Sequence, residues 1–163
     1  MVTPSFGVSR TFDTNLERLW AAFTEEDDLE AWYMPPDCQV LLSRMKLDAG
    51  GMYRYGFETP DGLSVWGRWD IRRVEPRSLM TFAQYFTSDA GALARNPHDP
   101  AWPRWLKTEF RFALQGGGAT VTINLAPENA DAPEIAAFRK GFLGLSQGWE
   151  RALDALSARL SRP

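Results

Sequence analysis

Apolar and polar residues alternate through much of the chain, and this two-residue period predicts β-strands. In residues 6–14, Phe6, Val8 and Phe12 fall on one face of an extended segment. The same pattern predicts six further strands, over residues 38–47, 52–58, 63–76, 79–86, 108–114 and 119–125. Turn-forming residues separate most of them, as at Gly50–Gly51, Pro60-Asp61-Gly62 and Gly116-Gly117-Gly118. Because most connections have hairpin length, we expect one antiparallel sheet of about six or seven strands.

A period of three to four residues, typical of helices, appears directly after the first strand. Leu16, Leu19 and Phe23 share one face, which predicts a short helix over residues 15–23. A second short helix is expected to follow and to end before Pro35–Pro36.

The C-terminal residues predict one long amphipathic helix. From residue 133 to residue 160 an apolar stripe recurs, formed by Phe138, Phe142, Leu145, Trp149, Leu153, Leu156 and Leu160. At 1.5 Å per residue the helix would be roughly 40 Å long. Gly141, Gly144 and Gly148 each weaken it by about 1 kcal/mol relative to Ala, so we expect the sheet or a loop to approach closely at the glycines.

These elements predict an α+β fold in a single domain over residues 1–163. A strongly curved antiparallel sheet would wrap around the long C-terminal helix, with the two short helices after the first strand. Such a sheet can leave an apolar cavity between itself and the helix. Residues 87–103 contain three prolines and are expected to form a long loop insertion that acts as a lid.

Composition excludes several classes of protein. The chain has 163 residues, of which 44% are hydrophobic and 24% charged, as in ordinary folded domains. The net charge is −3 and there is no basic tract, so we expect no nucleic-acid partner. No apolar run is long enough to cross a membrane and no signal-peptide pattern is visible at the N-terminus. The one cysteine, Cys38, fits a reducing cytoplasm, so a cytoplasmic location is expected.

Aromatic residues are the strongest functional signal, at 13% of the chain. The candidate cavity-wall residues are Trp32, Tyr33, Tyr55, Phe57, Trp66, Trp69, Phe82, Tyr85, Phe110, Phe112, Phe142 and Trp149. The hydroxyls of Tyr55 and Tyr85, with Arg54 or Gln84, are candidate polar anchors for one end of a ligand. Met34 and the loop around Trp102 and Trp105 would close the mouth. The alternative is that the rings pack against one another and leave no cavity.

Catalytic and metal chemistry finds little support in the residues. His98 is the only histidine and stands beside Asp99 in the proline-rich loop, where a solvent-facing pair is the simpler interpretation. One histidine and one cysteine argue against zinc or iron, and no nucleophile-elbow, metalloprotease or phosphate-loop motif occurs. We therefore predict no catalytic residue, no metal and no cofactor. Asp70 and Glu109 are expected on the outer face of the sheet, near arginines.

Five segments stand in a specific order along the chain: FDTNLERLWAAFTEEDDLEAWYMP, AGGMYRY, WGRWDIRRVEPRSLMTF, ATVTINLAP and GWERALDALSARL. In this order they resemble the SRPBCC superfamily (START or birch-pollen-allergen-like). Within it, the chain is most similar to the domain named for the activator of heat-shock-protein-90 ATPase homologue. The resemblance covers nearly the whole chain and implies the helix-grip fold with a pocket. Members of the superfamily bind lipids, sterols, hormones and polyketides, and some are cyclases or oxygenase subunits.

Three functions follow as hypotheses. The favoured one is a non-catalytic protein that binds a small hydrophobic or aromatic molecule between the sheet and the C-terminal helix. The second is an enzyme of cyclase or hydrolase type in the same cavity, which would need an inward-facing titratable group. The third is an interaction module that contacts a chaperone or forms a homodimer, which would need an exposed apolar patch.

Overall fold

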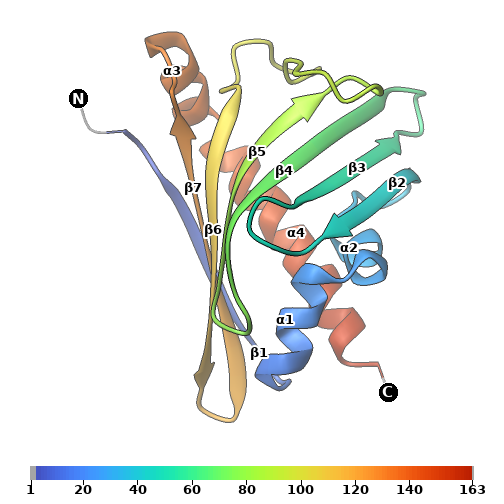
Figure 1. Cartoon of the computed structure of the whole chain (residues 1–163), viewed down its shortest axis with the longest axis vertical. Helices are drawn as coiled ribbons and strands as arrows, with labels where there is room; N and C mark the ends of the chain where they lie inside the picture. Colours follow the sequence, from blue (N-terminus) through green and yellow to red (C-terminus); the bar gives the residue numbers. More distant parts are fainter. Residues whose placement is uncertain (1–2, 163) are drawn as a thin grey trace.

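The computed structural model describes residues 3–162, and in this range the chain forms seven strands and four helices (Figure 1). The strands are β1 (Phe6–Phe12), β2 (Gln39–Lys46), β3 (Met52–Glu58), β4 (Ser64–Glu75), β5 (Leu79–Thr87), β6 (Trp105–Gln115) and β7 (Gly118–Glu128). The helices are α1 (Leu16–Thr24), α2 (Glu26–Trp32), α3 (Ala132–Lys140) and α4 (Phe142–Leu160). The predicted α+β class and the predicted strands are confirmed.

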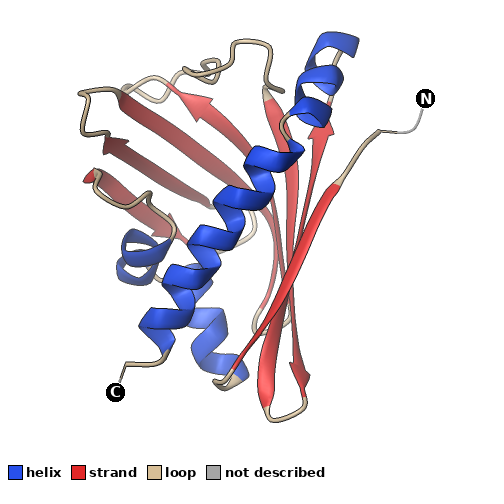
Figure 2. Ribbon diagram, turned by 180° about the vertical axis from the view of Figure 1, so that it is seen from behind, coloured by secondary structure: helices blue, strands red, loops and turns tan. Residues whose placement is uncertain are grey.

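All seven strands form one antiparallel sheet in the order β1-β7-β6-β5-β4-β3-β2. Five neighbouring pairs are consecutive in sequence. Turn signals predicted four of them, a long loop joins β5 to β6, and the β1–β7 pair joins the first strand to the last. The sheet curves, and α4 crosses its concave inner face, as Figure 2 shows. This is the helix-grip arrangement.

The short helices α1 and α2 are held by local capping and by side chains that link them to α4. The Asn15 side chain accepts a hydrogen bond from the Arg18 backbone N–H at 2.7 Å, which caps α1. Asp28 accepts hydrogen bonds from Arg18 at 2.8 Å and from Arg159 at 2.7 Å. One carboxylate therefore ties together α1, α2 and the last turn of α4.

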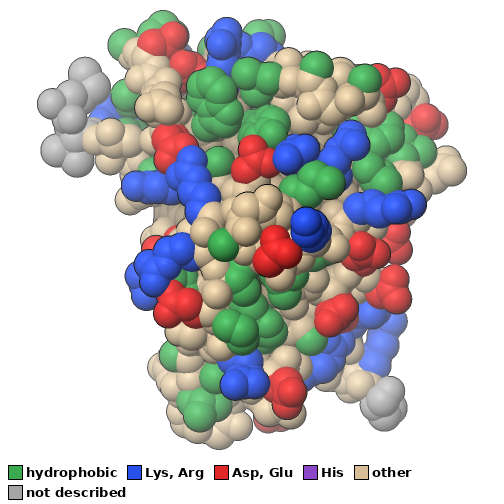
Figure 3. All heavy atoms as spheres, viewed as in Figure 1, with side chains coloured by type: hydrophobic (Ala, Val, Ile, Leu, Met, Phe, Trp, Pro, Cys, Tyr) green, Lys and Arg blue, Asp and Glu red, His purple; other side chains and the backbone are tan. Residues whose placement is uncertain are grey.

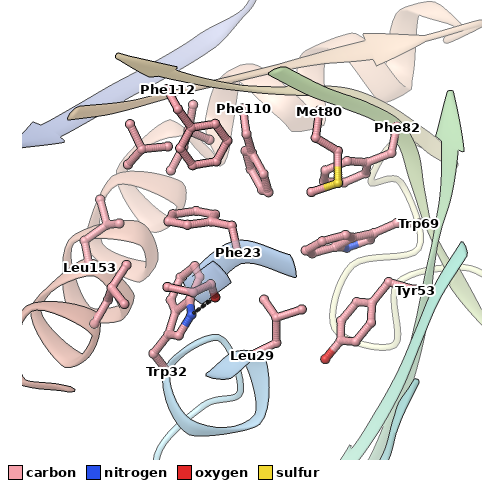
Figure 4. Close-up of a cluster of buried hydrophobic side chains, with 14 of the residues drawn as sticks. Phe23, Leu29, Trp32, Tyr53, Trp69, Met80, Phe82, Phe110, Phe112 and Leu153 are labelled. Atoms are coloured by element: carbon pink, nitrogen blue, oxygen red, sulfur yellow. Dashed lines mark hydrogen bonds between the residues drawn. The ribbon is translucent and has the colours of Figure 1, made fainter. Parts of the chain in front are cut away.

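The hydrophobic core occupies the end of the groove that α1 covers. Phe23 of α1 lies 4.7 Å from Trp32, 5.1 Å from Phe110 and 5.3 Å from Phe112, measured between ring centroids (Figure 4). Beside them Trp69 stacks on Phe82 at 4.2 Å. The rings fill this end of the groove, because α1 inserts an aromatic side chain between the sheet and α4.

The prediction of a single long helix over residues 133–160 is wrong in one respect. The helix is broken at Gly141, whose φ of −84° and ψ of 1° separate α3 from α4. A Cβ atom at Gly141 would lie 2.5 Å from Cζ3 of Trp102, so the loop before β6 approaches closely, as expected. At Gly144 and Gly148 the expected close approach is wrong, because an added Cβ would meet no atom within 4 Å.

Candidate functional site: a cavity between the sheet and α4

A cavity of about 630 Å³ lies between the inner face of the sheet and α4. It is on the side of the core away from α1, next to the loop that joins β5 to β6. Tyr33 and Met34 after α2, Tyr55 and Phe57 of β3, Gln84 and Phe86 of β5, and residues of the loop and of α4 line it. A volume of this size is within the usual range for pockets that bind small molecules.

The floor of the cavity is a face of α4 that carries almost no side chains. Gly144, Gly148 and Ala152 follow one another at intervals of four residues, so they lie on one face of the helix, and all three line the cavity. Leu145 and Trp149 flank them. The glycines therefore create part of the cavity volume, although each lowers helix stability.

The polar groups of the inner wall are two phenols and an amide. The Gln84 side-chain N–H donates a hydrogen bond to the Tyr33 hydroxyl at 3.1 Å. The rings of Tyr33 and Tyr55 meet edge to face, with centroids 5.6 Å apart. Burial raises the pKa of both tyrosines, and for Tyr33 the nearby Tyr55 adds to that effect. Both hydroxyls are therefore protonated throughout the physiological pH range.

Tyr55 has its position because residue 67, directly opposite on β4, is glycine. A Cβ atom at Gly67 would lie 2.3 Å from the Tyr55 hydroxyl oxygen. The Tyr55 hydroxyl therefore rests against the bare backbone of β4. This close approach gives the glycine a structural role in shaping the cavity wall.

The mouth of the cavity is covered by the loop between β5 and β6, which is fastened to α3. The buried Glu134 side chain accepts a hydrogen bond from the Arg104 backbone N–H at 2.7 Å and one from the Arg95 guanidinium at 3.3 Å. The Trp102 ring packs against Phe138, with centroids 5.5 Å apart. Asn96, His98 and Asp99 complete the rim.

Comparison with known proteins identifies the family. Residues 13–161 match the family model described as Activator of Hsp90 ATPase homolog 1-like protein. The chain belongs to this family. A search of curated proteins finds no match.

Solved structures of bacterial proteins share the fold of this Hsp90-activator-like family member. Protein Ms6760 from Mycobacterium smegmatis has a TM-score of 0.79 at 22% identity, over 99% of this chain and 93% of that one. A protein from Arthrobacter aurescens has a TM-score of 0.76 at 23% identity, over 98% and 87%. Protein CV1439 from Chromobacterium violaceum has a TM-score of 0.72 at 21% identity, over 98% of both chains. At these identities the similarity establishes the fold.

Six of the wall and anchor residues predicted from the sequence come together at the cavity of this family member. They are Tyr33, Tyr55, Phe57, Gln84, Tyr85 and Trp149. Met34 and Trp102 also lie at the cavity, as expected for the mouth. Trp105 is outside it, at the start of β6.

Five predicted wall residues are instead part of the core: Trp32, Trp69, Phe82, Phe110 and Phe112. The four on strands point to the inner side, as the alternation predicted, and Trp32 comes from α2. All five lie at the end of the groove that Phe23 fills. Phe142 is also outside the cavity and packs against Phe6 and Phe138 at 6.0 and 5.3 Å.

The predictions for Trp66, Arg54 and the Tyr85 hydroxyl are wrong because these groups lie on the outer face of the sheet. Trp66 alternates with the buried Val65 and Gly67, and its ring covers Gly56. Arg54 reaches toward Gly91. Tyr85 borders the cavity, but its hydroxyl donates a hydrogen bond to Asp70 at 3.0 Å. This hydroxyl is therefore not an anchor inside the cavity.

The outer face itself is a mixed charged surface, with basic and acidic side chains interspersed (Figure 3). Asp70 pairs with Arg68 at 2.5 Å, and Glu109 pairs with Arg111. The predicted placement of both carboxylates is confirmed, although each is paired within its own strand.

Sequence reasoning missed Phe86 and the small and aliphatic part of the cavity lining. Val65, Phe86, Leu106, Leu125, Gly144, Gly148 and Ala152 also line the cavity. The four-residue spacing of Gly144, Gly148 and Ala152 was the available signal for a helix face without side chains. Within residues 3–162 no group of three or more His, Cys, Asp or Glu is placed to hold a metal, and no helix is long and apolar enough to span a membrane.

Proposed function

We propose that the protein binds a small, predominantly apolar molecule in the cavity between the sheet and α4. The observation that carries the proposal is the glycine floor of α4. Gly144 and Gly148 have open space where side chains would stand, whereas Leu145 and Trp149 of the same helix pack against the core. A helix that only filled a core would gain stability from larger residues at these positions.

Chemistry of the lining supports an apolar or aromatic ligand. Aromatic and aliphatic side chains form most of the wall, with Tyr33, Tyr55 and Gln84 as the polar groups of the inner part. Burial of apolar ligand surface would supply about 25 cal/mol per Å². The family to which the chain belongs commonly binds hydrophobic ligands, which agrees with this proposal.

The test is to fill the cavity without harming the fold. N-phenyl-1-naphthylamine, an uncharged fluorescent probe, should bind to the native protein with enhanced emission and raise its melting temperature. Gly148→Leu should place a side chain in the cavity and weaken binding at least tenfold, while its melting temperature stays equal or rises. Gln147→Leu is the matched control, because Gln147 is exposed on the same helix and does not line the cavity. Equal binding by Gly148→Leu and the native protein would refute the proposal.

The two other hypotheses have less support. For a cyclase or hydrolase, the acidic or imidazole groups along the described lining are His98 and Asp99, both at the rim, and His98 is exposed. An interaction module would need an exposed apolar patch, but Trp102 of the loop is half-buried against Phe138 and Gly141, and Trp105 is half-buried as well. The enzyme hypothesis and the hypothesis of a chaperone contact or homodimer both stay predictions.

A further inference from the structure

We infer that the inner end of the cavity selects ligands that present an uncharged hydrogen-bond acceptor, such as a ketone, amide or lactone oxygen, and rejects carboxylates. The inference rests on the proposed binding function and defines the chemical class of the ligand. Its basis is the set of polar groups around Tyr33 and Tyr55 and the charges of the cavity lining.

The inner polar cluster presents groups that can donate hydrogen bonds to a ligand. Tyr33 and Tyr55 bring one O–H each, and Gln84 brings two N–H hydrogens, one of which donates to the Tyr33 hydroxyl at 3.1 Å. The buried Trp69 Nε1 acts on the same hydroxyl but makes no hydrogen bond of good geometry among the described residues. The two phenol O–H groups would therefore donate to an acceptor oxygen that a ligand supplies.

The tyrosine hydroxyls keep this donor character in solution. Burial raises the pKa of Tyr33 and of Tyr55, while contacts with Gln84 and Tyr33 offset part of the shift for Tyr55. Neither phenol becomes an anionic acceptor near neutral pH.

The charges around the cavity disfavour an anionic ligand. The described residues that line it include neither Lys nor Arg. Arg54 and Arg68 lie on the opposite face of the sheet, and Asp99 at the rim adds a negative charge. A carboxylate moved to the inner end would lose its hydration without gaining a cation, which is strongly unfavourable. An uncharged acceptor does not incur that cost.

Three probes that differ only at one end test the inference directly. They are 2-acetylnaphthalene, 2-ethylnaphthalene and 2-naphthoate, each measured by displacement of N-phenyl-1-naphthylamine at pH 7.5. We expect the ketone to bind about tenfold more tightly than the ethyl compound, the ratio that corresponds to about 1.4 kcal/mol. We expect the carboxylate to bind at least tenfold more weakly than the ethyl compound.

Variants then assign the preference to the phenols. The double variant Tyr33→Phe, Tyr55→Phe should lose the preference for the ketone, so that 2-acetylnaphthalene and 2-ethylnaphthalene bind it with about equal affinity. Tyr53→Phe is the matched control. Its hydroxyl is also buried, but it pairs with Ser43 at 2.8 Å and is outside the lining, so the tenfold ratio should persist.

The outcomes separate this inference from the proposed function. If none of the naphthalenes displaces the fluorescent probe and the probe itself does not bind, the proposed function fails. If the ethyl compound binds as tightly as the ketone, or the carboxylate binds most tightly, the cavity binds ligands but the inferred selectivity is overturned. Retention of the ketone preference in the double variant would also overturn it.

Discussion

Trp102 takes the space that a side chain at position 141 would need. A Cβ atom on Gly141 would lie 2.5 Å from Cζ3 and 3.1 Å from Cη2 of the indole ring. This contact holds the loop between β5 and β6 against the break between α3 and α4. The lid of the cavity and the bend in the C-terminal helix are therefore a single packing feature.

The contact predicts opposite effects for two glycines of the same helical region. Gly141→Ala should lower the free energy of unfolding by about 1–3 kcal/mol, because the added methyl group overpacks against Trp102. Gly148→Ala should raise it by about 1 kcal/mol, because its methyl group meets open space and Ala favours the helix. Urea denaturation measures both. Stabilisation by Gly141→Ala would contradict the account.

Gly67→Ala should disturb the cavity wall from the sheet side. The new methyl group would collide with the Tyr55 hydroxyl, so we expect a loss of about 1–3 kcal/mol in the free energy of unfolding. Gly117→Ala is the control, since it stands in the β6–β7 turn with no atom within 4 Å of an added Cβ. Thermal or urea denaturation compares them, and equal stabilities would show that Tyr55 is not fixed by Gly67.

Glu134 should control the lid. Its carboxylate holds the Arg104 backbone and the Arg95 side chain, and it forms a capping box with Asp131 at the start of α3. Glu134→Ala should cost about 1–2 kcal/mol of stability and increase amide hydrogen exchange in residues 95–104. Glu150→Ala, at an exposed position of α4, should leave exchange in the loop unchanged. A rise in exchange spread evenly over the whole chain would argue against a specific latch.

Asp28 should make stability fall in acid. Burial acts to raise its pKa, but the hydrogen bonds and charges of Arg18 and Arg159 outweigh it, and the folded-state pKa lies below the ordinary 3.8. A lowered folded-state pKa gives stabilisation that is present above pH 3.8 and is lost as the pH falls through the folded-state value. Asp28→Asn should lower stability at pH 7 by about 1–3 kcal/mol and flatten its pH dependence between pH 4 and the folded-state pKa. An unchanged pH profile, measured by urea denaturation, would exclude Asp28 as the source.

The sequence predicts the sheet well for reasons that are local. Alternation in β3 and β4 places Tyr55 and Trp69 on the inner side. The turn at Pro60-Asp61-Gly62 makes the two strands a hairpin. A period-two pattern identifies the face of a strand. It does not identify the position along the groove, and this depends on where Phe23 of α1 inserts. Trp69 and Tyr55 therefore looked alike in the sequence, although both are buried and only Tyr55 lines the cavity.

The break in the C-terminal helix shows the second limit. Apolar residues keep a helical spacing through Phe138, Phe142 and Leu145, so periodicity alone predicts a continuous helix. At the break, Trp102, which is distant in sequence and close in space, leaves room only for glycine at position 141. In the same way, the glycines at 144 and 148 signal a space, and only the fold shows that nothing in the protein fills it.

The most direct test of ligand binding in this cavity is an NMR titration of the isotope-labelled protein with N-phenyl-1-naphthylamine. The account predicts saturable chemical-shift changes concentrated at the backbone amides of Gly144 and Gly148 and at the Gln84 side-chain amide. The amide of Gly117, in the remote β6–β7 turn, should not move. Changes centred elsewhere, such as at the cleft formed by Arg18, Glu26 and Leu47, or no saturable change at all, would contradict the account.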